Sequence, residues 1–374
     1  MPFQQAFEML TREDYKGKLY IKQRFNVSVL KKEKKEMKWC VIGAGGIADR
    51  RTIPALLKDK QNELVAIMDR VPAAAENIGK KYGVAYFTDE KQMLNTVDCD
   101  VVYIGTPVSC HFKQAMTVLS FGKHVFVEKP VALTAKESKE LVEAFKKEGK
   151  QITIGYMMKY HNLHQKAKEI IQSDGIGQVN DVRVQFSCWY PDIPNAWRQK
   201  KSLGGGGAIM DLGVHCIELV EYLLDEEIED VKALYSTRTF SYEVEDGGII
   251  LFKTKSGVLG HIDVNFNIPD KASESKLELY GSKGYILCKG TLGQEETGSL
   301  SHLYAPQGEY SAQQNRTTDK PTEYTGEGKD LYLQQLQDFC ACVQSGKTDY
   351  FYADRAVQVQ EIVDKIYSAR TIYN

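Results

Sequence analysis

Three residues of this 374-residue chain have side chains suited to holding an alcohol oxygen and moving its proton: Lys129, Asp211 and His215. Lys129 stands in the sequence Glu128-Lys129-Pro130, directly after the short apolar run 125–127. If that run is a strand of a parallel sheet, Lys129 lies at the carboxyl edge, where the ligands of open α/β sheets bind. A lysine there is ordinarily surface decoration, but beside a bound ligand it becomes a candidate electrophile.

Asp211 and His215 close a glycine-rich stretch that begins with four consecutive glycines at 204–207. Residues four apart fall on one face of a helix. The glycines let the backbone pass close to a ligand. Taken alone, an aspartate–histidine pair at this spacing is most often a surface pair or a satisfied core histidine, so its interpretation depends on the rest of the chain.

A glycine-rich turn at 43–48 fits the G-x-G-x-x-A pattern of dinucleotide-binding proteins. It follows the apolar run 39–42 and precedes a helical pattern, which is the context that the motif requires. The first glycine permits the tight turn, the second lets the backbone approach a pyrophosphate, and the helix N-terminus offers free N–H groups to the anion. The residues expected to contact the cofactor here are Gly43, Gly45, Gly46 and Ile47.

Asp69 ends the next apolar run, 64–68, at roughly the 20-residue offset where an acid binds the ribose hydroxyls. A carboxylate repels a 2′-phosphate, so the sequence favours NAD over NADP as the cofactor. Arg70 counts against this preference, because a guanidinium can bind that phosphate or cover the adenine. Both residues are expected to line the cofactor site.

The elements that would position these residues alternate regularly from Met37 to about residue 160. Such alternation of strands and helices requires right-handed crossovers and predicts a parallel sheet covered on both faces. The predicted fold class is therefore α/β, with a Rossmann domain over 37–160. Strands are expected at 39–42, 64–68, 101–104, 125–127 and 151–154. Helices are expected at 47–57, 111–120 and 134–148, and a further helical stretch follows the second strand and ends at residue 82.

Beyond residue 160 the pattern changes to strands separated by turn residues, which predicts antiparallel pairing. We expect an α+β domain over 161–374 with a large, mostly antiparallel, open-faced sheet, and closing helices able to pack back on the Rossmann domain. Residues 291–328 are polar and glycine-rich and are expected to form a long loop. Strands are expected at 179–189, 231–240, 247–252, 257–267, 275–280 and 284–288, and helices at 162–173, 204–224, 331–344 and 355–368.

Composition narrows the class of protein. A formal net charge of −2 gives no support for nucleic acid or an anionic membrane as a partner. The eight cysteines form no Cys-x-x-Cys pair, which favours reduced thiols in a cytoplasmic protein. The chain opens with no secretory apolar region, and no run approaches the roughly 20 apolar residues that span a bilayer. Residues 1–36 are expected to be a disordered extension or an arm that packs on another subunit.

Taken in order, these motifs resemble the Gfo/Idh/MocA family, the glucose–fructose oxidoreductase and inositol dehydrogenase group. The resemblance covers nearly the whole chain from Met37 onward. Its markers are the turn at 43–48, Gly105-Thr106-Pro107 with His111, Gly122-Lys123-His124-Val125 running into Glu128-Lys129-Pro130, the segment 155–161, Trp197-Arg198, and the stretch ending at Asp211 and His215. Two features depart from the family: Val108 stands where many members carry Asn, and residues 1–36 have no counterpart.

The resemblance implies an NAD-dependent oxidoreductase that transfers a hydride between nicotinamide and a secondary hydroxyl or ketone of a sugar, glycoside or cyclitol. Lys129 would hold the carbinol oxygen, and His215 would be the general base in oxidation. Asp211 would orient His215 or bind the sugar, and no metal is expected. Further substrate contacts are expected from Tyr156 and Tyr160, and further cofactor contacts from Thr106, Pro107, His111, Glu128, Lys129, Trp197 and Arg198.

Two other functions stay open at this point. One is an NAD-dependent glycosidase that oxidises, eliminates and reduces without net redox change, as some relatives do. The other is a non-enzymatic, NAD-binding sugar sensor or repressor, against which the retained Lys129 and His215 argue. For each of these functions, the alternate apolar positions at 259–266 and 277–280 predict that one face of the sheet is apolar. We therefore expect a homo-oligomer, a dimer or tetramer, formed through the C-terminal sheet, as in relatives.

Overall fold

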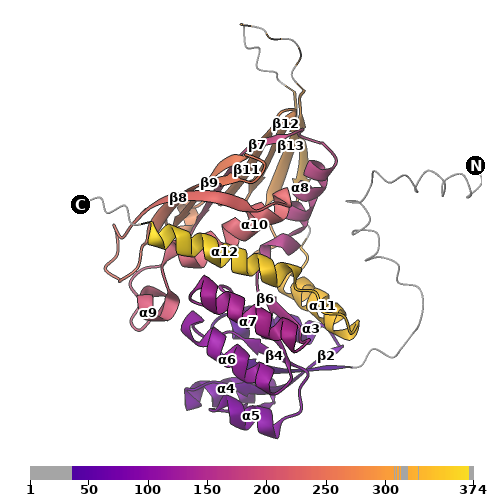
Figure 1. Ribbon diagram of the computed structural model, residues 1–374, viewed down its shortest axis with the longest axis vertical. Helices are drawn as coiled ribbons and strands as arrows, with labels where there is room; N and C mark the ends of the chain where they lie inside the picture. Colours follow the sequence, from indigo (N-terminus) through magenta and orange to yellow (C-terminus); the bar gives the residue numbers. More distant parts are fainter. Residues whose placement is uncertain are drawn as a thin grey trace, which may run out of the picture. The chain divides into compact units, whose positions relative to one another are not determined.

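The computed structural model of the chain describes residues 36–306, 308, 310, 312, 319–326 and 328–369 (Figure 1). The expectation for the N-terminal segment falls on residues 1–36, of which all but Glu36 lie outside the described part. It stays a prediction.

The first sheet has six parallel strands in the order β3-β2-β1-β4-β5-β6. Strands such as β4 are apolar and fully buried because helices cover both faces of the sheet. The order reverses between β1 and β4, and in open α/β sheets ligands bind at that switch point. The strands are β1 (Met37–Ile42), β2 (Asn62–Met68), β3 (Ala85–Phe87), β4 (Val101–Ile104), β5 (His124–Val127) and β6 (Ile152–Ile154).

The helices of this sheet begin at recognisable caps. Thr134 accepts a hydrogen bond from the backbone N–H of Glu137, and Asp89 accepts one from that of Gln92. The sequence analysis did not specify β3 or α5, because three largely exposed residues carry no strand period. The helices are η3 (Ala48–Thr52, π-helical), α3 (Ile53–Lys58), α4 (Pro72–Tyr82), α5 (Glu90–Thr96), α6 (Val108–Ser120) and α7 (Ala135–Lys147).

The second sheet has eight strands in the order β14-β13-β12-β11-β7-β10-β9-β8. Its neighbours pair antiparallel except β7 and β10, which run parallel and so depart from the expected pairing. The strands are β7 (Val179–Ser187), β8 (Ile228–Ser236), β9 (Gly247–Thr254), β10 (Leu259–Asn265), β11 (Lys276–Gly281), β12 (Gly284–Lys289), β13 (Ser299–Tyr304) and β14 (Thr322–Thr325).

Strands β13 and β14 correct the expectation of one long loop over 291–328. Strand β14 is the edge strand and β13 lies next to it, and only Leu300 of their residues is buried. An edge strand with so little buried apolar surface leaves no period in the sequence, so its backbone pairing was not visible there.

The helices of the C-terminal part link the two sheets. Helix α11 packs against α3 and α12 packs against α7, which brings the end of the chain back onto the Rossmann sheet (Figure 1). Helix α10 lies between α8 and α12, so nearly all its residues are buried. These helices are η4 (Met158–Tyr160), α8 (Asn162–Gln172), η5 (Trp197–Gln199), α9 (Lys201–Gly204), η6 (Ile209–Gly213, π-helical), α10 (Val214–Leu224), η7 (Asp270–Ala272), α11 (Leu331–Gln344) and α12 (Phe351–Ser368).

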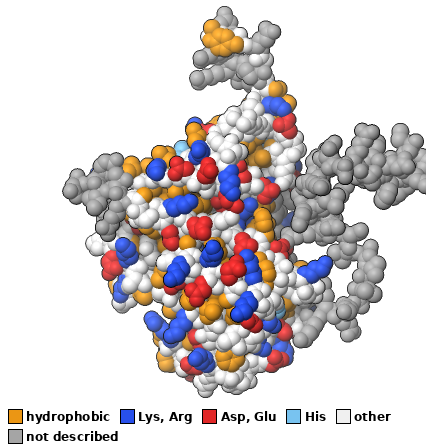
Figure 2. Space-filling view, in the orientation of Figure 1, with side chains coloured by type: hydrophobic (Ala, Val, Ile, Leu, Met, Phe, Trp, Pro, Cys, Tyr) orange, Lys and Arg blue, Asp and Glu red, His pale blue; other side chains and the backbone are white. Residues whose placement is uncertain are grey.

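Two surfaces of the molecule differ in character. The face drawn in Figure 2 mixes acidic and basic side chains without a large patch of one sign. The outer side of the second sheet instead exposes apolar residues at alternate positions, with Leu234, Ile249, Leu251 and Leu259 each more than half exposed. Their neighbours Ile250 and Phe252 point inward and are buried, as the period of two requires. Within the described residues, no helix has both the length and the apolar character needed to cross a membrane.

Candidate active site

The glycine turn after β1 forms a cradle that a side chain would fill. Gly43 has φ +85°, and a Cβ there would lie 2.8 Å from Cγ2 of Thr106. A Cβ on Gly45 would meet nothing within 4 Å, so this side of the turn is open. The backbone N–H groups of Gly46 and Ile47 lie at the start of the helix, where no preceding helical turn offers a carbonyl to accept their hydrogen bonds. The turn therefore suits a pyrophosphate, whose charge the helix N-terminus favours.

A cavity of about 260 Å³ extends from this cradle along the carboxyl edge of the sheet. Asp69 lies in its wall, where the carboxylate accepts hydrogen bonds from the backbone N–H groups of Ala44 (3.3 Å) and Val71 (2.9 Å). Among the lining residues are ten that the sequence predicts to bind the cofactor: Gly43, Gly45, Gly46, Ile47, Asp69, Arg70, Thr106, Pro107, Trp197 and Arg198.

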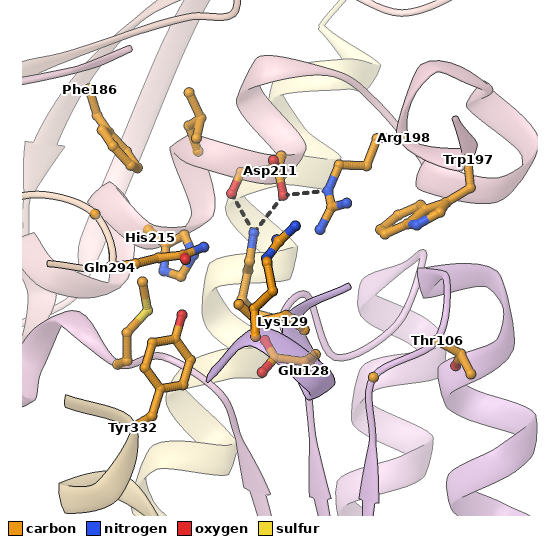
Figure 3. Close-up of a pocket in the computed structure, with 16 residues that line it drawn as sticks. Thr106, Glu128, Lys129, Phe186, Trp197, Arg198, Asp211, His215, Gln294 and Tyr332 are labelled. Atoms are coloured by element: carbon orange, nitrogen blue, oxygen red, sulfur yellow. Dashed lines mark hydrogen bonds and ion pairs between the residues drawn. The ribbon is translucent and has the colours of Figure 1, made fainter. Parts of the chain in front are cut away.

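A second cavity of about 130 Å³ adjoins the first, since the two share Ile47, Gly105, Thr106, Trp197 and Arg198 (Figure 3). Four further predicted residues meet in its wall although they come from the segment directly after β5 and from the η6–α10 helix. These are Glu128, Lys129, Asp211 and His215. The sheets therefore bring the candidate chemistry next to the candidate dinucleotide site.

Lys129 and Arg198 converge on the Asp211 carboxylate at the centre of this cavity (Figure 3). The Lys129 ammonium donates to Oδ1 of Asp211 at 2.6 Å and to its backbone oxygen at 2.7 Å, and Arg198 Nε donates to the same Oδ1 at 3.2 Å. An ammonium has three N–H donors. Two are used, so the third remains for a ligand oxygen.

The charges around this group set its protonation. Burial alone would raise the pKa of Asp211, but Lys129 and Arg198 outweigh burial and hold that pKa well below its usual range. Burial and the nearby Lys129 cation lower the pKa of His215 well below 6.5, against the opposing effect of Asp211. His215 is therefore neutral at pH 7 and able to accept a proton, while Asp211 is ionised.

His215 is not oriented by a direct hydrogen bond to Asp211, whose described carboxylate bonds are accepted from Lys129 and Arg198. The segment Ile209–Gly213 is π-helical, and its wider turn changes the relative direction of residues four apart. Instead, the His215 ring meets Tyr156 edge-on, with ring centroids 5.8 Å apart. Its buried Nδ1 has no hydrogen-bond partner within the described part of the chain.

Glu128 is held from behind by a buried chain of hydroxyls. Thr52 donates to the Tyr103 hydroxyl at 3.1 Å, and Tyr103 donates to Oε1 of Glu128 at 2.8 Å. Burial raises the pKa of Glu128, and the bond from Tyr103 opposes that shift. These hydrogen bonds fix Glu128 at the end of β5, and with it the next residue, Lys129.

Three predicted site residues lie outside the walls of both cavities. His111 is buried between the carbonyl oxygens of Thr106 and Pro130, each 2.9 Å from a ring nitrogen. Burial lowers its pKa to about 4, so the neutral ring donates to one of the two and braces both loops. Tyr156 lies behind His215, and Tyr160 donates to Asp338 at 2.9 Å. Their direct contact with ligands stays a prediction.

The cavity wall also contains residues that the sequence analysis missed. Gln294 comes from the loop after β12, and Tyr332 from the first turn of α11. Neither belongs to a motif, and both come from segments far along the chain, so no local signal pointed to them. Other such residues are Arg50, Met157 and Phe186 in the second cavity, and Cys110 and Gln114 in the first.

Comparison with known proteins identifies the class. Residues 37–156 match the model of an oxidoreductase family with an NAD-binding Rossmann fold, and residues 164–287 match the GFO/IDH/MocA C-terminal domain. The fold and the two adjoining cavities thus define an NAD(P)-binding oxidoreductase. The chain belongs to the Gfo/Idh/MocA family, and its relatives include reductases and dehydrogenases of sugars and cyclitols.

Two relatives and one solved structure illustrate the range of proteins to which this chain is similar. The 1,5-anhydro-D-fructose reductase of Ensifer adhaerens is 25% identical over 71% of this chain and 79% of its own. The scyllo-inositol 2-dehydrogenase (NAD⁺) of Bacillus subtilis is 26% identical over 76% and 80%. The 3-ketoreductase KijD10 of Actinomadura kijaniata, solved with NADP and TDP-benzene, has a TM-score of 0.78 at 21% identity over 89% and 98%. The last likeness shows the fold alone.

Proposed function

We propose that the protein is an NAD-dependent dehydrogenase acting on a secondary hydroxyl of a sugar, glycoside or cyclitol, and on the corresponding ketone in reverse. The observation that carries this proposal is the pairing, in one small cavity, of a lysine with a spare N–H and a neutral histidine. That cavity opens beside a glycine cradle suited to a pyrophosphate.

The proposed chemistry divides between two side chains. A bound nicotinamide supplies the acceptor for the hydride that leaves the carbinol carbon. The third N–H of Lys129 donates to the carbinol oxygen and stabilises its developing negative charge. His215 accepts the hydroxyl proton in oxidation and returns it in reduction. Asp211 keeps the Lys129 ammonium in place through their 2.6 Å ion pair. Tyr156 holds the His215 ring edge-on.

The cofactor preference is the first testable part. Asp69 in the ribose end of the cavity should make NAD bind more tightly than NADP, because a carboxylate repels the 2′-phosphate. Replacing Asp69 by Ser should reduce or reverse that preference, with a change of about tenfold or more in the ratio of dissociation constants for one lost charge repulsion. Titration of both cofactors measures it. Asp98→Ser, which removes an exposed acid of the same domain, is the control. Tighter binding of NADP by the unmodified protein would contradict the assignment.

The second testable part is the assembly. We propose a closed homo-oligomer, a dimer or a tetramer built from two such dimers, formed through the outer face of the second sheet, because Leu234, Ile249, Leu251 and Leu259 are exposed there. Light scattering at micromolar concentration should give a mass at least twice the 42.2 kDa of the monomer. Leu251→Lys should shift that mass toward the monomer.

Leu57→Lys, at a similarly exposed leucine on α3, is the matched control and should leave the mass unchanged. A monomeric unmodified protein, or equal masses for both variants and the unmodified protein, would remove this part of the proposal.

A further inference from the structure

The loop between β12 and β13 brings a polar side chain into the wall of the second cavity. Gln294 lines that cavity together with Lys129 and His215 (Figure 3). No part of the proposed chemistry uses it. A polar residue of the cavity wall that has no part in the proposed hydride or proton transfer is suited to contact the substrate elsewhere.

The orientation of the Gln294 amide follows from its partner. Arg51, from η3 of the Rossmann domain, donates from Nε to Oε1 of Gln294 at 3.3 Å, and its second nitrogen bonds Glu295. Because a guanidinium can only donate, the amide oxygen of Gln294 must face Arg51. The NH₂ group is then left as a donor, and the natural partner for a donor in this cavity is a hydroxyl oxygen of the ligand.

Two neighbouring histidines hold the loop at both ends. His161 and His164 are fully buried, with ring centroids 5.0 Å apart. His164 Nδ1 lies 2.8 Å from the Met158 carbonyl and must donate to it, so Nε2 accepts from the Thr291 hydroxyl at 2.9 Å. His161 Nε2 donates to the Thr297 carbonyl at 3.0 Å.

These tautomers are mutually consistent. His161 Nδ1 accepts from the backbone N–H of Leu163 at 3.1 Å, so each ring uses one donor and one acceptor and is neutral. Burial lowers the pKa of both rings, that of His164 to about 3. Within the described residues, no group of three or more His, Cys, Asp or Glu side chains is placed to hold a metal. The histidine pair is accounted for by the loop that it anchors.

We propose that Gln294 is a substrate-binding residue that selects among sugars and cyclitols by donating to a hydroxyl other than the one being oxidised. The His161–His164 pair and Arg51 position it. This inference rests on the proposed function, because it assigns a contact to the substrate of that reaction. It assigns a substrate contact to the loop between β12 and β13, which the proposed chemistry does not use.

The test compares kcat/KM of the unmodified protein and Gln294→Met, which keeps the side-chain length but donates nothing. The probes are the most rapidly oxidised of D-glucose, methyl β-D-glucoside and myo-inositol, together with its monodeoxy analogues. We expect Gln294→Met to lose about tenfold, mainly through KM, as for one hydrogen bond to the substrate. For one deoxy analogue, the kcat/KM of the unmodified protein should be lower than with the parent compound by a similar factor. For that analogue, Gln294→Met should cause no further loss of kcat/KM.

Matched variants separate contact from folding. Thr291→Val removes the hydroxyl that His164 accepts and should raise KM in the same direction, whereas Thr291→Ser should not. Gln92→Met, at an exposed glutamine of α5, should change nothing. The affinity for NAD should be the same in all variants. If Gln294→Met stays within about two-fold of the unmodified protein on every probe, or loses equally on all analogues, the inference is wrong. No oxidation of any probe by the unmodified protein would instead overturn the proposed function.

Discussion

Replacing Lys129 by methionine should lower kcat by about 10²–10⁴-fold, while NAD still binds. The variant keeps the length of the side chain but removes the cation that holds the carbinol oxygen and balances the partly buried Asp211 carboxylate. The expected loss lies in kcat, because the charge on the oxygen develops only in the transition state. Steady-state rates with the best substrate, and titration with NAD, measure the two effects separately.

Lys113→Met is the matched control, since Lys113 is exposed on α6 and lines neither cavity. Removing one partner of a buried ion pair also destabilises a protein, typically by about 3–5 kcal/mol. Here Arg198 remains bonded to Asp211, so a smaller loss of stability is expected, and thermal unfolding of the variant shows whether it is folded at the assay temperature. Near-normal turnover by folded Lys129→Met would remove Lys129 from the proposed chemistry.

His215→Asn should lower kcat for oxidation by a similar factor of about 10²–10⁴, because no other group is assigned to take the hydroxyl proton. The pH dependence of kcat/KM for oxidation is an independent test of this role of His215. A general base works only when unprotonated, and burial holds the pKa of His215 well below 6.5. The kcat/KM for oxidation should therefore persist as the pH falls through about 6.5, where an ordinary histidine would become protonated.

The control for this histidine is His261→Asn, at a position on β10 outside both cavities, which should leave turnover unchanged. A tenfold fall in kcat/KM per pH unit below about 6.5 that disappears in His215→Asn would mean that the buried, neutral environment assigned to the ring is wrong.

The parts of the site predicted from the sequence are those whose signals are local. The turn at 43–48 is contiguous, and its geometry depends on the glycines themselves. Asp69 and Lys129 follow apolar runs, and the carboxyl ends of parallel strands meet at one edge, so their approach could be inferred without coordinates. The same logic predicted the fold class, which the structure and the family models confirm.

The parts that could not be predicted depend on tertiary contacts. Gln294 reaches the cavity because a histidine pair more than a hundred residues earlier in the chain anchors its loop, and Tyr332 because α11 packs against α3. The hydrogen bond from Tyr160 to Asp338 of a later helix likewise has no local signal in the sequence. The π-helical segment before α10 is equally invisible in the sequence, and it directs the Asp211 carboxylate to Lys129 rather than to His215.

Reduction of NAD by the purified protein in the presence of sugars, glycosides and cyclitols is the most direct test of the proposed hydride transfer. We expect that at least one of them is oxidised, with one reduced nicotinamide formed for each ketone. Cleavage of a glycoside without accumulation of reduced cofactor would contradict it in favour of a redox-neutral glycosidase. Tight NAD binding with no turnover of any compound would contradict it in favour of a sensor.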